Sequence, residues 1–184
     1  GSEMCIRDRT STPASDATGL CSDGYNVFAA FGTNGIYSTN TGTGAAASYT
    51  TGTVNGPIAY VKGRLMVANG TSIYNVITGG GAALPTALFT HANAGFTWVG
   101  FAEGKAAIYA AGYAGDKSII YRIPIKPDGS ALDLPIVAGT LPDGEVVRNI
   151  TGYLGNIFIG SDKGARLAIP DGQGNLRIGG LIPT

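Results

Sequence analysis

Residues 57–76 read PIAYVKGRLMVANGTSIYNV, and the fold prediction depends on the pattern in this stretch. Two short apolar runs flank the pair Lys62-Gly63, and a third run follows the polar pair Asn69-Gly70. Glycine suits such positions because two-residue hairpin turns need residues with a positive φ. The stretch therefore predicts three antiparallel strands that are joined by two tight turns.

The same pattern of three strands and two turns recurs in residues 96–123 and 147–169, and in a weaker copy in residues 22–39. The first turn of each copy contains a glycine, namely Gly24, Gly63, Gly104 or Gly155. These glycines are 39, 41 and 51 residues apart, which brackets the roughly 40–50 residues of a four-stranded β-propeller blade. A fourth, outer strand is expected in each of the variable pieces 47–54, 87–90, 134–137 and 176–178.

Three of the predicted strands, RLMVA (64–68), AAIYAA (106–111) and NIFIG (156–160), are nearly continuous apolar runs. A strand with one wet face alternates between apolar and polar residues, whereas a strand covered on both faces does not. Blades of a propeller stack face to face, so these runs favour that architecture. We predict an all-β fold, a partial β-propeller of about four antiparallel blades, with a β-solenoid or another β-repeat as the alternative.

The composition argues against two classes of partner. Charged residues make up 13% of the chain, about half the usual share of roughly 25%. Lys and Arg together number 12, as do Asp and Glu, and no basic cluster is present to attract a polyanion. No apolar run reaches the roughly 18 residues that a membrane helix needs. We expect no nucleic-acid partner and no membrane insertion.

The motif search yields no catalytic, cofactor-binding or metal site. GFAEGK (100–105) is one residue short of a phosphate-binding loop and is followed by Ala106 instead of Ser or Thr, so it predicts a hairpin turn. His91 lies in a loop without a nucleophile elbow and is interpreted as a surface loop residue. Cys21 is interpreted as a small half-buried hydrophobe.

The carboxylates are the remaining candidates, because a pair of them could hydrolyse a glycosidic bond. The candidates are Asp116, Asp128, Asp133, Asp143, Glu145, Asp162 and Asp171. Most of them lie beside glycine in turns, and turn chemistry explains them without catalysis. The loop DGQGN (171–175) lacks the ordered ligand spacing of a calcium loop and is interpreted as a glycine-rich turn. We therefore expect a protein that is not an enzyme and that holds no cofactor.

Residues 1–9, GSEMCIRDR, differ from the rest of the chain in their density of charge. They resemble the translation of a transposase adapter used in shotgun sequencing libraries. The resemblance implies that this segment is an artefact, disordered and not part of the fold. We expect residues 10–21 to be a linker or an incomplete strand, and residues 22–184 to be a truncated β-propeller-like repeat domain.

Much of residues 23–184 resembles tail-associated proteins of tailed bacteriophages, in particular the minor tail proteins of phages that infect actinobacteria. The stretches GYNVFAAFGTNGIY (24–37), ALFTHANAGFTWVGFAEG (87–104) and LPDGEVVRNITGYLGNIFIGSDKGARLA (141–168) carry the resemblance. It implies a non-catalytic structural protein of the virion, located in the tail or its tip, that serves assembly or contact with the host surface. The implied partners are other tail proteins and a host cell-surface glycan or protein.

Two alternatives to the tail protein remain open from the sequence. One is an extracellular β-propeller module that binds a glycan or a protein. The other is a fragment of a propeller enzyme that cleaves polysaccharides and has its catalytic residues mostly outside this chain.

Overall fold

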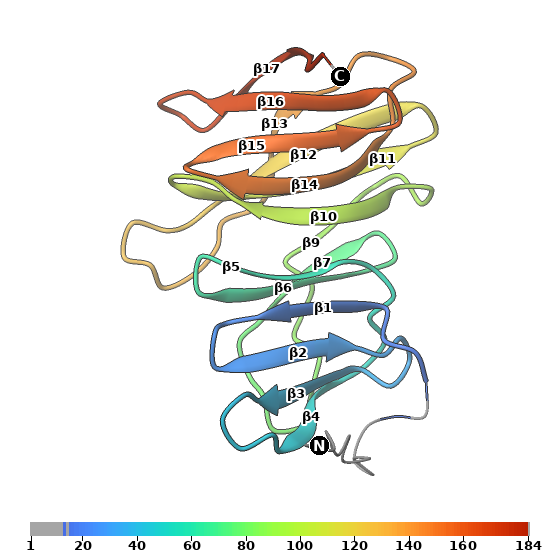
Figure 1. Ribbon diagram of the computed structural model, residues 1–184, viewed down its shortest axis with the longest axis vertical. Coiled ribbons are helices and arrows are strands. Elements are labelled where there is room, and N and C mark those ends of the chain that lie inside the picture. Colours follow the sequence, from blue (N-terminus) through green and yellow to red (C-terminus); the bar gives the residue numbers. More distant parts are fainter. Residues whose placement is uncertain (1–12, 14, 184) are drawn as a thin grey trace, which may run out of the picture.

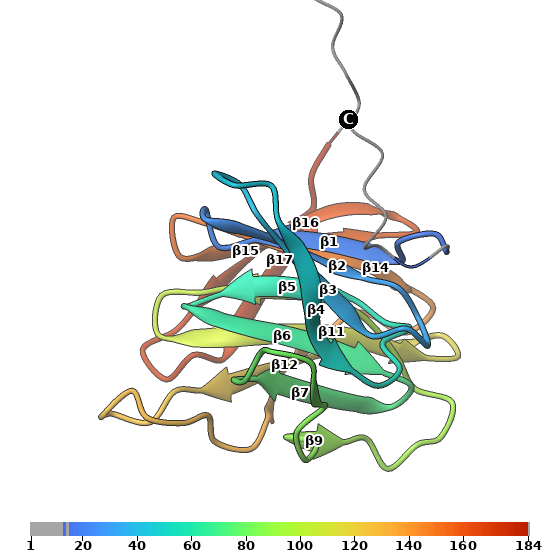
Figure 2. The same ribbon diagram turned by 90° about the horizontal axis from the view of Figure 1, so that it is seen from below.

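The computed structural model describes residue 13 and residues 15–183, in which it contains 17 β-strands and no helix. Residues 1–9, interpreted above as an adapter, lie outside the described residues. The strands form four separate sheets, each antiparallel apart from one added edge strand. Figure 1 shows the sheets following one another along the long axis of the molecule, and Figure 2 shows blade 1 in front of the others. The predicted all-β, β-propeller-like fold is confirmed.

We number the four sheets as blades in chain order, with the innermost strand of each given first. Blade 1 contains β1 (Gly19–Ser22), β2 (Asn26–Ala30), β3 (Ile36–Asn40) and β4 (Ala46–Thr51). Blade 2 contains β5 (Ile58–Val61), β6 (Arg64–Asn69), β7 (Ser72–Val76) and β9 (Phe89–Thr90). Blade 3 contains β10 (Thr97–Glu103), β11 (Ala107–Ala114), β12 (Lys117–Pro124) and β13 (Ile136–Thr140). Blade 4 contains β14 (Val147–Tyr153), β15 (Asn156–Ser161), β16 (Gly164–Pro170) and β17 (Leu176–Leu181).

Blade 1 departs from the predicted pattern at both of its edges. Three of the four residues of its first strand, β1, belong to residues 10–21. We interpreted that segment as a linker or an incomplete strand. Its outer edge gains a fifth strand, β8 (Ala82–Ala83), which pairs in parallel with β4. This short strand comes from the loop between β7 and β9 of blade 2, and the Thr50 hydroxyl donates to the Ala82 carbonyl at 2.6 Å. Blade 2 thus holds the edge of blade 1 through its own loop.

Of the four predicted first turns, those at Gly63 and Gly155 have the expected two-residue geometry, whereas those at Gly24 and Gly104 are longer. Lys62-Gly63 and Leu154-Gly155 are two-residue turns in which both residues have positive φ, the type I′ geometry that matches strand twist. The prediction of the same turn at Glu103-Gly104 is wrong. There β10 ends at Glu103 and β11 begins at Ala107, and the backbone N–H of Gly104 donates to the Ala107 carbonyl across a longer loop.

The middle strands of blades 2 and 3 are covered on both faces. In β6, Leu65 and Val67 pack into a cluster shared with blade 1, whereas Met66 and Ala68 pack into a cluster shared with blade 3. The strand β11 repeats this arrangement and sends successive residues to the clusters on either side of blade 3. The nearly continuous apolar runs follow directly from this stacking, because every second residue faces a different neighbour.

Blade 4 differs, and the prediction that NIFIG is covered on both faces is wrong for this strand. Ile157 and Ile159 of β15 are buried against blade 3. Phe158 and Gly160, which point to the other face, are only partly buried. Among the described residues no further sheet packs against that face, so the apolar pattern of β15 has one buried side.

The innermost strands β1, β5, β10 and β14 lie beside one another in chain order, and glycine lets them approach closely. A Cβ atom added to Gly152 in β14 would collide with the carbonyl oxygen of Glu103 in β10. A Cβ atom on Gly19 in β1 would come within 2.7 Å of Ile58 in β5. The spacing of the blades near the axis therefore depends on the absence of side chains at these two positions.

We expect Gly152→Ala to destabilise the chain by about 1–3 kcal/mol or more, because the added methyl group forces β14 away from β10. The measurement is the free energy of unfolding from urea titration. Gly160→Ala in β15 is the matched control, since its added Cβ would meet no atom closer than 3.8 Å. Equal stability of the two variants would contradict the close approach of the inner strands.

Candidate functional site

The turns that follow the four innermost strands lie at one end of the blades. We call this end the turn face and define it by residues 23–25, 62–63, 104–106 and 154–155. Figure 1 shows these connections on the left side of the molecule. The loops that join the third and fourth strands of the blades return to the same end, so residues 171–175 of blade 4 lie beside the inner turns. The turn face is therefore where separate blades bring loops together.

Lys62 ties the turns of blades 2 and 3 together. Its backbone N–H donates to Glu103 Oε2 at 2.9 Å, and its Nζ donates to the carbonyl of Lys105 at 3.1 Å. The Lys62 Nζ also lies 3.6 Å from Glu103 Oε1. An open hollow of about 710 Å³ lies between these turns and residues 152–155 of blade 4.

Exposed apolar side chains border this hollow. Leu154 is 83% exposed and has a φ of 50°, a left-handed conformation that is unfavourable for a leucine. Tyr153 beside it is 66% exposed, and Tyr25, which is outside the lining of the hollow but in the turn of blade 1, is 77% exposed. A strained and exposed leucine next to an exposed tyrosine is unusual, and residues of this kind concentrate at sites of interaction.

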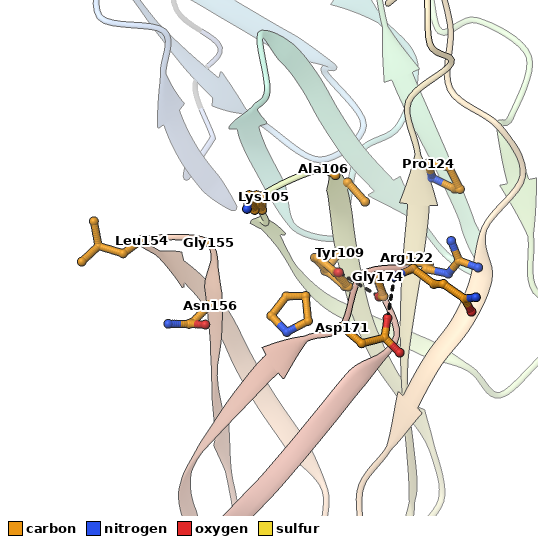
Figure 3. A pocket seen from close by; sticks show the side chains of 14 residues that line it. Lys105, Ala106, Tyr109, Arg122, Pro124, Leu154, Gly155, Asn156, Asp171 and Gly174 are labelled. Carbon is orange, nitrogen blue, oxygen red and sulfur yellow. Dashed lines mark hydrogen bonds between the residues drawn. The ribbon is translucent and has the colours of Figure 1, made fainter.

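A second cavity, a cleft of about 450 Å³, lies between blades 3 and 4 and adjoins the hollow at Lys105 and Leu154. Figure 3 shows its lining, with Tyr109 between Lys105 and Arg122 in the view. Residues of β11, β12 and the turn 104–106 form the blade 3 side. The blade 4 side consists of Leu154, Gly155, Asn156, Pro170, Asp171, Gly172, Gln173 and Gly174.

In the cleft, the negative charge of Asp171 is satisfied by hydrogen bonds, whereas the Nε of Arg122 has no partner among the described residues. Asp171 accepts hydrogen bonds from the backbone N–H groups of Gln173 at 2.8 Å and Asn175 at 2.9 Å, which lower the pKa of its carboxyl group. In contrast, the Nε of Arg122 is buried and has no hydrogen-bond partner among the described residues. The ion pairs found in the described part of the chain include neither Arg122 nor Lys105.

Tyr109 connects the two sides of the cleft. Its hydroxyl group donates to the Gly174 carbonyl at 2.8 Å, and its side chain is almost fully buried. This burial raises the pKa of the Tyr109 hydroxyl above its usual value. The tyrosine therefore holds the 171–175 loop against blade 3 and forms the floor of the cleft.

Three of the candidate carboxylates, Asp128, Asp162 and Asp171, accept hydrogen bonds in separate turns. Asp128 accepts hydrogen bonds from the backbone and hydroxyl groups of Ser130, and Asp162 accepts one from the backbone N–H of Val146. Asp171 closes the DGQGN turn as described above. No group of three or more His, Cys, Asp and Glu residues with metal-binding geometry occurs in residue 13 and residues 15–183.

Glu145 is the exception among the carboxylates, because it is buried and forms an ion pair that its sequence position does not reveal. Glu145 is 3% exposed. The Nη2 of Arg166 lies 2.6 Å from Glu145 Oε2, the Nε of Arg166 lies 2.8 Å from Oε1, and the Ser161 hydroxyl donates to Oε1 at 2.6 Å. The hydrogen bonds from Arg166 are the main reason why the pKa of Glu145 falls below its usual 4.5.

The same segment joins blade 4 to blade 3. Ser118 of β12 donates to the Glu145 carbonyl at 2.8 Å and accepts from the backbone N–H of Val147 at 2.8 Å. Both contacts are buried. The ion pair of Glu145 and Arg166 therefore has a clear structural role, which is to fix the start of β14 against both blades.

His91 is more enclosed than the interpretation as a surface loop residue implies. Its ring stacks on Phe96 with ring centroids 3.9 Å apart and an angle of 16° between the planes. Its Nδ1 accepts a hydrogen bond from the backbone N–H of Asn93 at 3.1 Å. Trp98 and Tyr121 complete an aromatic cluster around it. His91 thus packs between blades 2 and 3, away from both cavities.

Cys21 lies half-buried against the cluster between blades 1 and 2, where the sequence placed a small hydrophobe. Burial, with a smaller contribution from the negative charge of Asp23, raises the pKa of its thiol to about 12. The described part of the chain contains no helix that could span a membrane.

Comparison with known proteins supports the fold alone. No protein-family model matches the chain, and no curated protein matches it in sequence. Among solved structures it is similar to streptogramin B lyase, with 17% identity, a TM-score of 0.66 and coverage of 95% of this chain and 57% of the lyase. It is also similar to the extracellular domain of BT4673 from B. thetaiotaomicron, with 11% identity, a TM-score of 0.63 and coverage of 95% and 24%.

A third similar structure is PorZ, a bacterial surface component of the type-IX secretion system of Porphyromonas gingivalis. The identity is 11%, the TM-score is 0.56, and the match covers 96% of this chain and 22% of PorZ. The chain thus spans about a quarter of the length of the BT4673 extracellular domain and of PorZ, and little more than half of the lyase.

We expect Glu145→Gln to destabilise the chain by about 1–3 kcal/mol, because it leaves the partly buried Arg166 guanidinium without a counter-charge. Urea unfolding at pH 7 measures the difference. Asp116→Asn is the matched control, since this carboxylate lies exposed in the turn between β11 and β12. A change of less than about 1 kcal/mol in Glu145→Gln would contradict the structural role of the pair.

The same pair predicts a pH dependence. Because the pKa of Glu145 is lower in the folded chain than its usual 4.5, the pair contributes its full stability above about pH 4.5 and loses it as the pH falls through the folded value. The stability difference between the original chain and Glu145→Gln should therefore shrink below pH 4.5. A difference that stays constant down to pH 3 would argue against the lowered pKa.

Proposed function

We propose that this chain is a non-catalytic structural module of a bacteriophage tail or tail tip, in the virion, whose turn face contacts other tail proteins or the host surface. The observation that carries this proposal is the exposed, conformationally strained Leu154 beside Tyr153 and the adjoining hollow. The strained backbone and exposed apolar surface of such a group destabilise the isolated chain. Contacts with a partner that covers the group offset this cost. The resemblance to minor tail proteins gives the partner its context.

A role without catalysis fits the use of the carboxylates. Asp128, Asp162 and Asp171 accept backbone hydrogen bonds in three separate turns, and Glu145 is neutralised by Arg166. A glycoside hydrolase needs two carboxyl groups that face one cleft about 5–10 Å apart. The cleft between blades 3 and 4 is lined by one carboxylate, Asp171, which is held by its own loop. This arrangement favours binding over bond cleavage.

An extracellular binding module of a bacterium is the second candidate. Its support comes from two of the similar structures, one described as an extracellular domain and one as a surface component. Both candidates place the chain outside the cytoplasm and use the turn face for contact. They differ in genetic context.

The full gene with its neighbours distinguishes the two candidates. We expect genes for capsid, tape-measure and lysin proteins beside it, together with tail genes. A signal for secretion at the start of the full gene, within a bacterial chromosome that lacks phage genes, would contradict the tail assignment and favour the bacterial module.

We expect Leu154→Asn to abolish most of the binding of the fluorescently labelled chain to actinobacterial cells, because asparagine removes the apolar contact. The variant should be as stable as the original chain or more stable by about 1 kcal/mol, since asparagine tolerates the left-handed conformation better than leucine. Flow cytometry measures the binding, and thermal unfolding measures the stability.

Leu20→Asn is the matched control, because Leu20 is 65% exposed but lies in β1, outside the turn face. Its binding to cells should equal that of the original chain. Equal loss of binding in both variants, or no loss in Leu154→Asn, would contradict contact through the turn face.

A further inference from the structure

The cleft between blades 3 and 4 has an excess of positive charge among its described residues. Arg122 and Lys105 line it, and neither takes part in the ion pairs found among the described residues. Asp171 is the one carboxylate of the lining, and its oxygens accept hydrogen bonds from Gln173 and Asn175. The lining therefore carries one net positive charge, and its two cations form no ion pair within residues 15–183.

Arg122 is the more informative of the two cations. Its Nε is buried and has no partner in the described part of the chain. A buried polar group without a hydrogen bond is costly, and more so when it is charged, so such groups are rare and call for a partner such as an ordered water or an ion. The planar guanidinium fits the two oxygens of a carboxylate better than it fits any neutral group. A carboxylate would supply both charge and acceptor atoms to this guanidinium.

The rest of the lining suits a sugar ring. Asn156 and Gln173 offer amide groups that both donate and accept hydrogen bonds to hydroxyl groups. Pro124, Pro170 and Leu154 offer apolar surface for the C–H faces of the ring. The volume of about 450 Å³ lies within the usual range for small-ligand pockets, roughly 300–1,000 Å³, and accommodates one or two sugar units.

We propose that this cleft binds a saccharide that carries a carboxylate, a uronic-acid unit, with Arg122 holding the carboxylate and Lys105 adding long-range attraction. One net positive charge matches the single charge of one carboxylate at Arg122, whereas a phosphate monoester concentrates about −1.5 to −2 charges on one group at pH 7. This inference rests on the proposed function, because it names the chemistry of the host surface that the turn face meets. Figure 3 shows the two cations on either side of Tyr109.

The test is isothermal titration calorimetry of the purified chain with digalacturonic acid, uncharged galactobiose and glucose 6-phosphate. We expect binding of digalacturonic acid, at least tenfold weaker binding of the other two ligands, and weaker affinity at high salt. Comparable binding of galactobiose, tighter binding of glucose 6-phosphate, or no binding of digalacturonic acid up to ~10 mM would overturn the proposal.

Arg122→Leu should weaken the binding of digalacturonic acid about tenfold or more, the usual effect of losing a hydrogen bond to a charged group. Its stability should not fall, because the substitution removes an unpaired buried group. Arg148→Leu is the matched control, since Arg148 is exposed at the start of β14 and lies over Tyr113. Unchanged binding in Arg122→Leu, or an equal loss in Arg148→Leu, would contradict the site.

Lys105→Ala provides a second variant of the same site if Arg122→Leu does not fold, since Lys105 is exposed in a turn. We expect it to weaken the binding and to reduce its salt dependence. If the original chain shows no Leu154-dependent binding to cells, the proposed function is contradicted. If the original chain binds cells in this way but has no affinity for digalacturonic acid, this inference alone is contradicted.

Discussion

The packing of successive side chains of β6 and β11 into different apolar clusters is the constraint on which the rest of the structure depends. Leu65 faces blade 1 and Met66 faces blade 3, and β11 divides its residues in the same way. A strand of this kind is stable only between two other sheets. The blades must therefore stack, and stacking in turn requires the inner strands to approach so closely that Gly152 has no room for a side chain. Burial of the apolar faces, rather than hydrogen bonding between sheets, determines the architecture.

The cavities follow from the same stacking. Because the inner strands run side by side in one direction, their turns meet at one end, where Lys62 bonds to Glu103 across two blades. The cleft lies where the 171–175 loop of blade 4 meets β11 and β12. Tyr109, whose hydroxyl donates a hydrogen bond to the Gly174 carbonyl, forms its floor. The scaffold is apolar and closely packed, whereas Lys105 and the strained Leu154 lie at its turn face and Arg122 lines the adjoining cleft. The contacts that we propose for the turn face thus lie outside the apolar clusters that stabilise the fold.

Much of the fold could be predicted from the sequence, because it is encoded locally. The turn at Lys62-Gly63 and the apolar run 64–68 are visible in adjacent residues, and both appear in the structure as expected. The features that were missed depend on residues distant in sequence. Arg166 lies 21 residues after Glu145, and neither residue carries a motif. The cleft combines Arg122 with a loop some fifty residues later in the chain. The strand β8 lies between β7 and β9 of blade 2 in the sequence but pairs with β4 of blade 1. No local pattern indicates which loops meet, since this depends on how the blades stack.

Native-state hydrogen exchange of the backbone amides tests the central role of the doubly covered strands most directly. The account predicts that the amides of β6 and β11 exchange most slowly, because their protection is lost only when two apolar interfaces open. The amides of β15 should exchange faster, since Phe158 and Gly160 lie on a face that is only partly buried. Protection of β15 equal to or greater than that of β11 would contradict the account, because stability would then not follow from coverage on both faces.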